Sequence, residues 1–219
     1  MHITDKVKKA SRNLGIIRRS FNFLDKHSFL CLYKAMVRPH LEYANQVWAP
    51  RLQRQIDSLE NVQRRATKLV PGFKDMSYEN RLKALNLPTL AYRRLRGDVI
   101  ELYKIVSGKY DPEVCKDFIK MRKDVTPKGM NTRGNAFKIF KEFNGQNLRK
   151  NSFPHRIVDI WNSLPAKVVN APSIMCFESR FDRFSKHQDI KFDYRAKYKL
   201  SDTGSDNLEV YADLDLEAQ

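Results

Sequence analysis

The sequence predicts an all-α protein with the architecture of an irregular multi-helix bundle. Several long stretches repeat apolar residues at steps of three and four, which is the period of a helix with one buried stripe. Most of these stretches begin after Ser, Thr or Asp and end near Pro, Gly or Asn, as helices do. Glycine is scarce, with 8 residues in 219. Helices of this kind bury their apolar stripes against one another.

The clearest helix is expected at residues 52–70. Its apolar positions follow the helical period without a break: Leu52, Ile56, Leu59, Val62, Ala66 and Leu69. The other side of this helix is basic and supplies four candidate contacts to an acidic partner: Arg54, Arg64, Arg65 and Lys68. Because Arg54 and Arg65 are about three turns apart, they share a face.

The first helix is expected at residues 3–23, with Val7, Ala10, Leu14 and Ile17 on one side and basic residues on the other. These basic residues are Lys6, Lys8, Lys9, Arg12, Arg18 and Arg19. Its apolar face should pack into the core, which would leave the basic side toward solvent or a partner.

A second helix is expected at residues 26–38, with Asp25 as its N-cap. Pro39 cannot donate its amide and clashes with the preceding turn, so it should kink or split the helix. The continuation beyond Pro39 should bury one side, formed by Leu41, Ala44, Val47 and Trp48. Trp48 could also stack on a base, although a buried tryptophan is the commoner case.

Two helices are expected after Pro71 and Gly72. Ser77 should cap one that points Leu82 and Leu85 inward, and Thr89 should cap a longer one that ends at Gly108. The apolar seam of the longer helix consists of Tyr92, Leu95, Val99, Leu102, Tyr103 and Val106. Basic candidates for partner contact lie off this seam, at Arg93, Arg94, Arg96 and Lys104.

The middle of the chain is less regular. Asp111 and Pro112 should open a short helix that ends near Lys120. Residues 121–135 have the polar, Pro- and Gly-containing composition of a loop. Residues 136–143 set apolar side chains against lysines, which predicts a short strand or an extended arm.

Helices are expected again at residues 152–164 and 174–184, the latter capped by Ser173. The apolar stripe of this last helix is Ile174, Phe177, Phe181 and Phe184. From Gln188 onward the chain becomes polar and then acidic, and we expect it to be disordered.

The charge of the chain is strongly positive, with a formal value of +16. Six of the 25 acidic residues lie within residues 201–219, which contain no Lys or Arg, so 41 basic residues face 19 acidic ones over residues 1–200. Such an excess favours a polyphosphate partner, namely RNA, an RNA–DNA hybrid or DNA. Plain solvation and a membrane-surface role are the alternatives, but no strongly apolar anchor accompanies the charge.

The cysteines and the apolar runs indicate where the protein resides. Cys31, Cys115 and Cys176 are odd in number and widely spread, so neither a disulfide framework nor a zinc pattern fits and a reducing compartment is expected. No apolar run reaches the roughly 20 residues of a membrane span, and the N-terminus lacks the apolar centre of a signal peptide. We therefore expect a cytoplasmic or nuclear protein with no membrane partner.

No catalytic, metal or cofactor site is predicted. The five histidines never approach a Cys or a carboxylate at a metal-ligand spacing, and no Gly-rich phosphate loop follows a strand. Residues 211–215, YADLD, resemble the Tyr-Ala-Asp-Asp string that binds metal ions in polymerases. Here Leu214 replaces the second Asp, and the segment lies in an acidic tail without flanking strands.

Four strings closely resemble one protein family, the reverse transcriptases of jockey-like non-LTR retrotransposons. They are LYKAMVRPHLEYANQVWAP at residues 32–50, LENVQRRATKLVPG at 59–72, SYENRLKALNLPTLAYRRLRGDVIELYKIVSG at 77–108 and FPHRIVDIWNSLPAKVVNAPSIMCFESRFDRF at 153–184. The resemblance covers most of residues 1–187. It corresponds to the region that follows the catalytic palm.

This resemblance implies a thumb and post-thumb segment that packs against the duplex of template RNA and growing DNA. It also implies that the fingers, the palm with its catalytic aspartates and an endonuclease would precede Met1, so that the chain would be a fragment of an RNA-directed DNA polymerase. Carried over by position, residues 63–68 and 93–98 would face nucleic acid. No catalytic residue is carried over.

Three segments are expected on these grounds: a thumb-like basic segment at 1–72, a post-thumb helical segment at 73–187 and a polar to acidic, disordered tail at 188–219. The expected function is non-catalytic binding of the template–primer backbone. The alternative is a degenerate remnant or a helical scaffold without a nucleic-acid role, whose exposed apolar seams would dock a palm domain or another protein. A polymerase or nuclease activity of its own has little support in the residues.

Overall fold

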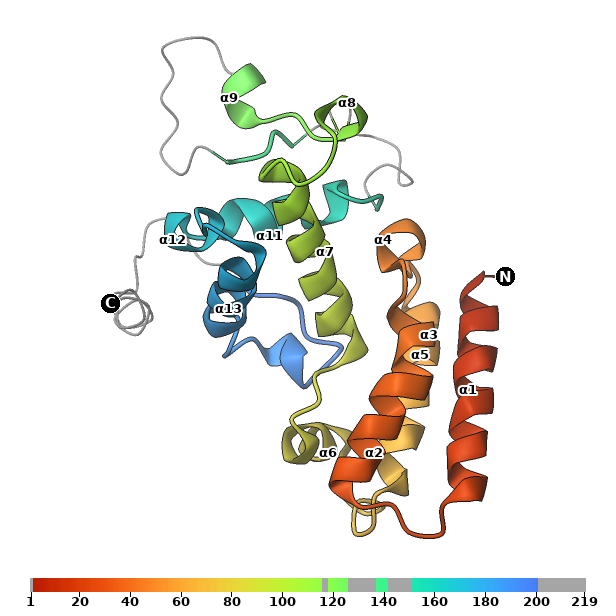
Figure 1. The fold of residues 1–219 in the computed structure, drawn as a ribbon. Coiled ribbons are helices and arrows are strands. Elements are labelled where there is room, and N and C mark those ends of the chain that lie inside the picture. The colour runs from red at the N-terminus through yellow and green to blue at the C-terminus, as the bar shows by residue number, and fades with distance from the viewer. Residues whose placement is uncertain (1, 116–117, 126–136, 142–150, 201–219) are drawn as a thin grey trace. The chain divides into compact units, whose positions relative to one another are not determined.

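The structure, a computed structural model, describes residues 2–115, 118–125, 137–141 and 151–200. These residues form helices and no sheet, which confirms the prediction of an all-α fold. The chain divides into two compact units (Figure 1). Unit 1 consists of Met1–Arg96 and Asp189–Lys197, and unit 2 contains the described residues of 97–188 and 198–200.

Unit 1 is built around the packing of α1 (His2–Ser20) against α5 (Gln53–Ala66) and the segment between them. Figure 1 shows α1, α3 and α5 side by side. The remaining elements are α2 (Lys26–Leu32), the π-helix η1 (Tyr33–Val37), α3 (Arg38–Glu42), α4 (Asn45–Trp48), the 3-10 helix η2 (Thr67–Leu69), α6 (Tyr78–Leu85), the start of α7 (Leu90–Val106) and the 3-10 helix η4 (Asp189–Lys191).

The predicted apolar stripes form the core of unit 1. On α1, Ala10, Leu14 and Ile17 are buried, and on α5 the fully buried apolar residues are Leu59, Val62 and Ala66. The ends of the predicted α5 stripe are looser, since Leu52 is 46% exposed and precedes the first turn of the helix. The helical period therefore predicts the buried residues in the middle of these helices correctly and those at the ends less well.

Pro39 changes the helix around it in a specific way. The segment continues through Pro39, and the preceding turn is a π-helix in which the N–H of Arg38 donates to the carbonyl of Tyr33. This widened turn accommodates a residue that has no amide donor. The helix then stops at Tyr43, because Ala44 adopts a left-handed conformation with φ of 56°.

This break makes one prediction wrong. Leu41 is buried as expected, but Ala44 is exposed and Val47 is 88% exposed, so the expected apolar side beyond Pro39 does not form. The helical period assumed a continuous helix, and the left-handed residue resets the direction of every side chain after it. Trp48 is half-buried, and its indole N–H donates to the carbonyl of Tyr43 at 2.7 Å.

Four predicted helix caps are confirmed. The side chains of Asp25, Ser77 and Ser173 each accept a backbone N–H from the first turn of the following helix, at 3.2 Å in each case. Thr89 does the same for α7, where its Oγ1 accepts the N–H of Tyr92 at 3.0 Å. Cap residues act through neighbours in sequence, so they can be recognised without the tertiary structure.

The segment after Gln188 differs from its predicted disorder. Residues 189–197 belong to unit 1, where Ile190 and Tyr194 are each 8% exposed. Thr89 holds this segment, since its N–H donates to the carbonyl of Lys191 at 2.9 Å and its hydroxyl donates to that of Ile190 at 2.6 Å. Two isolated apolar residues in a polar stretch are a weak sequence signal for such docking. Residues 201–219, where the acidic tail was predicted, lie outside the described residues.

The division of the chain also differs from the predicted boundary at residues 72 and 73. Phe73, Leu82, Leu85, Leu87 and Leu90 all pack in the same core as α1 and α5. The turn at Pro71 and Gly72 ends a helix without ending the unit, and the division falls inside α7, after Arg96.

Unit 2 is organised around an aromatic cluster. The ring of Tyr103 stacks on Phe177 at 4.2 Å between centroids, and Phe177 also meets Trp161 and Phe181. The Tyr103 hydroxyl donates to the carbonyl of Ala171 at 2.6 Å. The elements of this unit after α7 are α8 (Pro112–Cys115), α9 (Arg122–Val125), η3 (His155–Ile157), α11 (Val158–Ser163), α12 (Ala166–Val169) and α13 (Ile174–Phe184).

The strand or extended arm predicted at residues 136–143 is described only for residues 137–141. There Ile139 forms an isolated antiparallel bridge with Met121 and is 3% exposed. Arg122 and Phe140 add backbone hydrogen bonds on either side, both 2.8 Å long. This part of the segment is extended, in agreement with the prediction, and it stays a single bridge.

Within the described parts of the chain, no helix combines the length and the apolar character that crossing a bilayer requires.

The Thr89 hydroxyl should account for much of the docking of residues 189–197. Replacing Thr89 by Val keeps the shape and removes the hydroxyl, which leaves the carbonyl of Ile190 and the N–H of Tyr92 without this partner in a buried place. We expect a loss of about 1–3 kcal/mol in the free energy of unfolding, measured by urea denaturation, with faster amide exchange at residues 190–194. Thr89→Ser keeps the hydroxyl and should lose clearly less; a Thr89→Val variant as stable as the unchanged protein would show that the hydroxyl does not hold this segment.

Candidate nucleic-acid interface

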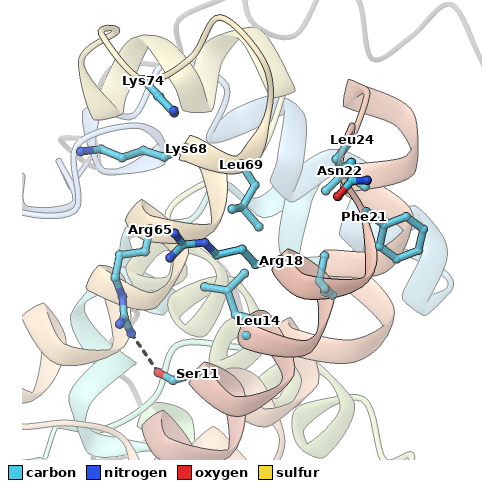
Figure 2. A pocket seen from close by; sticks show the side chains of 12 residues that line it. Ser11, Leu14, Arg18, Phe21, Asn22, Leu24, Arg65, Lys68, Leu69 and Lys74 are labelled. Atoms are coloured by element: carbon cyan, nitrogen blue, oxygen red, sulfur yellow. Dashed lines mark hydrogen bonds between the residues drawn. The ribbon is translucent and has the colours of Figure 1, made fainter.

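Unit 1 contains a hollow of about 640 Å³ with basic residues in its wall, shown in Figure 2. It is lined by α1, by the residues that follow α1, by α5 with η2, and by Lys74 in the turn before α6. We name it the basic pocket and define it by the residues that line it: Ser11, Leu14, Gly15, Ile17, Arg18, Phe21, Asn22, Leu24, Arg65, Lys68, Leu69 and Lys74.

The basic pocket has cations on several sides and no carboxylate in its wall. Arg18, Arg65, Lys68 and Lys74 line it and are all exposed, and no Asp or Glu is among the lining residues. In Figure 2 the side chain of Arg18 extends from α1 toward α5. Like charges gathered without a counter-ion produce a positive potential that attracts an anion. The pocket is therefore suited to phosphate.

One of these cations is held in position. The Nη2 of Arg65 donates to the hydroxyl of Ser11 at 2.9 Å, which joins α5 to α1 (Figure 2). A guanidinium has five N–H donors, so a single bond to Ser11 leaves donors for a phosphate oxygen. A side chain that is already oriented loses less conformational freedom when it binds.

The predicted basic residues of α5 have different surroundings. Arg65 of α5 and Lys68 of the following η2 line the basic pocket, and Arg54 is exposed outside it, about three turns before Arg65 on α5. Arg64 turns inward: its guanidinium lies over the rings of Tyr78 at 5.1 Å and Tyr194 at 5.6 Å, and Nη2 donates to the Tyr194 hydroxyl at 3.4 Å. Arg64 therefore holds residues of unit 1 together.

The predicted basic residues of α7 are engaged within the protein. Arg93 forms a two-point ion pair with Glu42, through Nε at 2.5 Å and Nη2 at 3.0 Å. Arg94 is only 6% exposed, and Arg96 is half-buried and takes part in an interaction of the fold. Lys104 pairs with Glu101 at 3.2 Å. In the segment at residues 93–98, which the resemblance assigned to nucleic acid, these arginines serve structural contacts.

Two of the four cations of the basic pocket were not among the predicted contacts, namely Arg18 and Lys74. A signal for Arg18 was present in the sequence, since it directly follows Ile17 and lies one helical turn beyond Leu14. A basic residue beside a buried stripe lies at the edge of the helix–helix contact. Arg65 occupies the same kind of position beside Ala66, so basic residues from the two helices converge where the helices pack.

The α5 helix also has an inward polar side that the prediction missed. Gln63, which the resemblance placed on a nucleic-acid face, is fully buried, and this expectation is wrong. The hydroxyl of Tyr33 donates to its Oε1 at 2.6 Å, while its Nε2 donates to the Tyr78 hydroxyl at 3.1 Å and to the carbonyl of Pro88 at 3.0 Å. A glutamine between arginines looks like surface in a sequence, and only the position of its partners shows otherwise.

Glu60 continues the same buried network one turn earlier. It is 1% exposed and accepts the Tyr78 hydroxyl at 2.7 Å and the N–H of Leu90, at the start of α7, at 3.2 Å. Burial raises the pKa of Glu60 above that of an ordinary glutamate, while the Tyr78 hydrogen bond and then the charge of Arg94 act in the opposite direction. A carboxylate at a helix N-terminus is also favoured by the helix dipole.

A second hollow in unit 1, of about 430 Å³, has mixed charge. It is lined by His2, Asp5, Lys6, Lys9, Pro39, His40 and Tyr43. Lys6 lies over the ring of Trp48 at 4.6 Å, and burial, followed by the neighbouring charge of Lys9, lowers the pKa of Lys6. With Asp5 in its wall and Lys6 occupied by an aromatic ring, this hollow is a weaker anion site than the basic pocket.

In the described ranges, no three or more His, Cys, Asp or Glu side chains are grouped so that they could hold a metal ion. Residues 211–215, which resemble the polymerase string, lie outside those ranges. Comparisons with protein-family models, with curated proteins and with solved structures gave no match for this chain.

The buried Glu60 should make the stability of the protein depend on pH. Because burial raises its pKa, the folded chain binds this proton more tightly than the unfolded chain does. The contribution is therefore fully present below the pKa of an unfolded glutamate, about 4.3, and is lost as pH rises through the raised folded value. Glu60→Gln should remove this component, seen in urea denaturation between about pH 4 and 8.

The matched control is Glu79→Gln, at an exposed position that pairs with Lys83. It should change the free energy of unfolding by less than about 1 kcal/mol. If Glu60→Gln retained the full pH dependence of the unchanged protein, Glu60 would not be its source.

Proposed function

We propose that this chain is a non-catalytic nucleic-acid-binding segment of a retrotransposon RNA-directed DNA polymerase, of the kind that follows the palm. It would contact the backbone of the template–primer through the basic pocket of unit 1. The observation that carries the proposal is the convergence of Arg18, Arg65, Lys68 and Lys74 on one hollow without a carboxylate in its wall. The resemblance of residues 32–50, 59–72, 77–108 and 153–184 to this family supports the same reading.

The chemistry of the basic pocket suits positioning rather than catalysis. Lys and Arg contacts to phosphate hold a nucleic acid in register without reading its sequence. Arg93 of α7 has a structural role instead, since it fixes α7 to Glu42 of α3.

A helical scaffold that docks another protein remains the second candidate, and exposed apolar residues favour it. The most exposed of these in unit 1 are Phe23, at 73%, and Tyr43 and Val47, at 78% and 88%. Figure 1 places α4, which contains Val47 and follows Tyr43, at one end of this unit and the connection between α1 and α2, which includes Phe23, at the other. A protein interface needs a contiguous apolar patch, so we favour nucleic acid.

The proposal predicts salt-dependent binding to an RNA–DNA hybrid. Replacing both Arg18 and Arg65 by Gln should weaken binding at least about tenfold at 0.1 M salt and should make the dependence of log K on log salt shallower by roughly 1.8. Anisotropy titrations of a labelled hybrid over a series of salt concentrations measure both. Arg12→Gln is the matched control, because Arg12 is an exposed residue of α1 that does not line the pocket.

Binding that is indifferent to salt, or an equal effect of the Arg12 and pocket variants, would count against the proposal. In the second case the general charge of the chain would bind the hybrid without a defined site.

A further inference from the structure

We propose that the basic pocket takes an unpaired nucleotide of a single strand, with its base against Phe21 and its phosphates on the surrounding cations. This inference rests on the proposed function and specifies the nucleic acid that the pocket accepts. A duplex presents its phosphates on a convex surface and keeps its bases stacked inside. A single strand exposes the faces of its bases as well, and aromatic side chains bind those faces.

The first argument is the apolar part of the basic pocket. Leu14, Ile17 and Leu24 contribute to its wall from the buried core, with exposed fractions of 8%, 2% and 4%. Phosphate contact alone has no use for such a wall. The volume of the basic pocket, about 640 Å³, lies in the range of cavities that hold small organic molecules. Apolar walls combined with cations match a nucleotide, which has a flat base and a charged backbone.

The second argument is Phe21, which lines the pocket and is 44% exposed. It is held in place from the α1 side, where its N–H donates to the carbonyl of Ile17 at 3.2 Å. On the α2 side the connection is anchored by the buried Leu24 and by the N-cap Asp25. An exposed aromatic ring on a short connection held at both ends can stack on a base at a small cost in conformational entropy.

The third argument is Asn22, between these two anchors. It is exposed, lines the pocket and is drawn among its side chains in Figure 2. A side-chain amide has both donors and an acceptor, and bases offer complementary groups along their edges. A base on Phe21 would therefore meet an adaptable hydrogen-bonding group from the same connection.

The experiment compares a labelled oligo(U) strand with a labelled RNA–DNA hybrid, both titrated against the full chain by anisotropy at one salt concentration. Phe21→Leu keeps an apolar side chain and removes the aromatic face. It should weaken oligo(U) binding roughly 5- to 100-fold and change hybrid binding less than about twofold. Phe21→Trp keeps an aromatic face and should bind oligo(U) about as tightly as the unchanged chain does.

Phe23→Leu is the matched control, because Phe23 is an even more exposed phenylalanine of the same connection that does not line the pocket. It should leave both affinities unchanged, and thermal unfolding of each variant checks that the fold is intact.

The outcomes separate this inference from the proposed function. If Phe21→Leu binds oligo(U) as the unchanged chain does, or loses both ligands equally, the single-strand inference is overturned while salt-dependent hybrid binding through Arg18 and Arg65 still stands. If the unchanged chain binds neither ligand, both the inference and the proposed function fail, and the scaffold reading takes their place.

Discussion

Helix α5 is held by a buried chain of hydrogen bonds that runs from Tyr33 through Gln63 and Tyr78 to Glu60 and on to the N-terminus of α7. Each group in this chain has a partner, which makes a polar network tolerable in a core and specific for one arrangement. Because Glu60 and Gln63 must point inward together with Leu59 and Val62, the rotation of α5 about its axis is determined. The direction of Arg65 toward α1, where it donates to Ser11, follows from that rotation.

The positive charge of the chain is divided between structural and accessible positions. Arg64 lies over the rings of Tyr78 and Tyr194, Arg93 pairs with Glu42, and in unit 2 Arg156 pairs with Asp98 through two hydrogen bonds of 2.7 and 2.8 Å. A buried arginine that lost such a partner would leave an uncompensated charge, so these residues are committed to the fold. The net charge therefore overstates the number of cations that an acidic partner can reach. The cations of the basic pocket differ from the structural ones because the pocket wall includes no carboxylate.

Fold class was accessible from the sequence because the helical period and the helix caps are local properties. Ser77, Thr89 and Ser173 cap the helices for which they were predicted, and the buried faces of α1, α5 and α13 follow the predicted stripes. The predictions that fail depend on long-range contacts. Gln63 looked exposed because its partners are 15 to 30 residues away, and residues 189–197 looked disordered because Thr89 holds them from about a hundred positions earlier.

The sequence by itself determined that this protein is helical, strongly basic and built from amphipathic segments, since composition and periodicity are carried by each segment alone. Only the tertiary structure decided which basic residues remain accessible. Arg18 and Arg65 meet because α1 and α5 pack side by side, whereas Arg93 and Arg94, equally basic in the sequence, are taken up by the fold. The physical reason is that an ion pair or a pocket forms between residues that are far apart in the sequence. A helical period shows only the face of its own helix on which each residue lies.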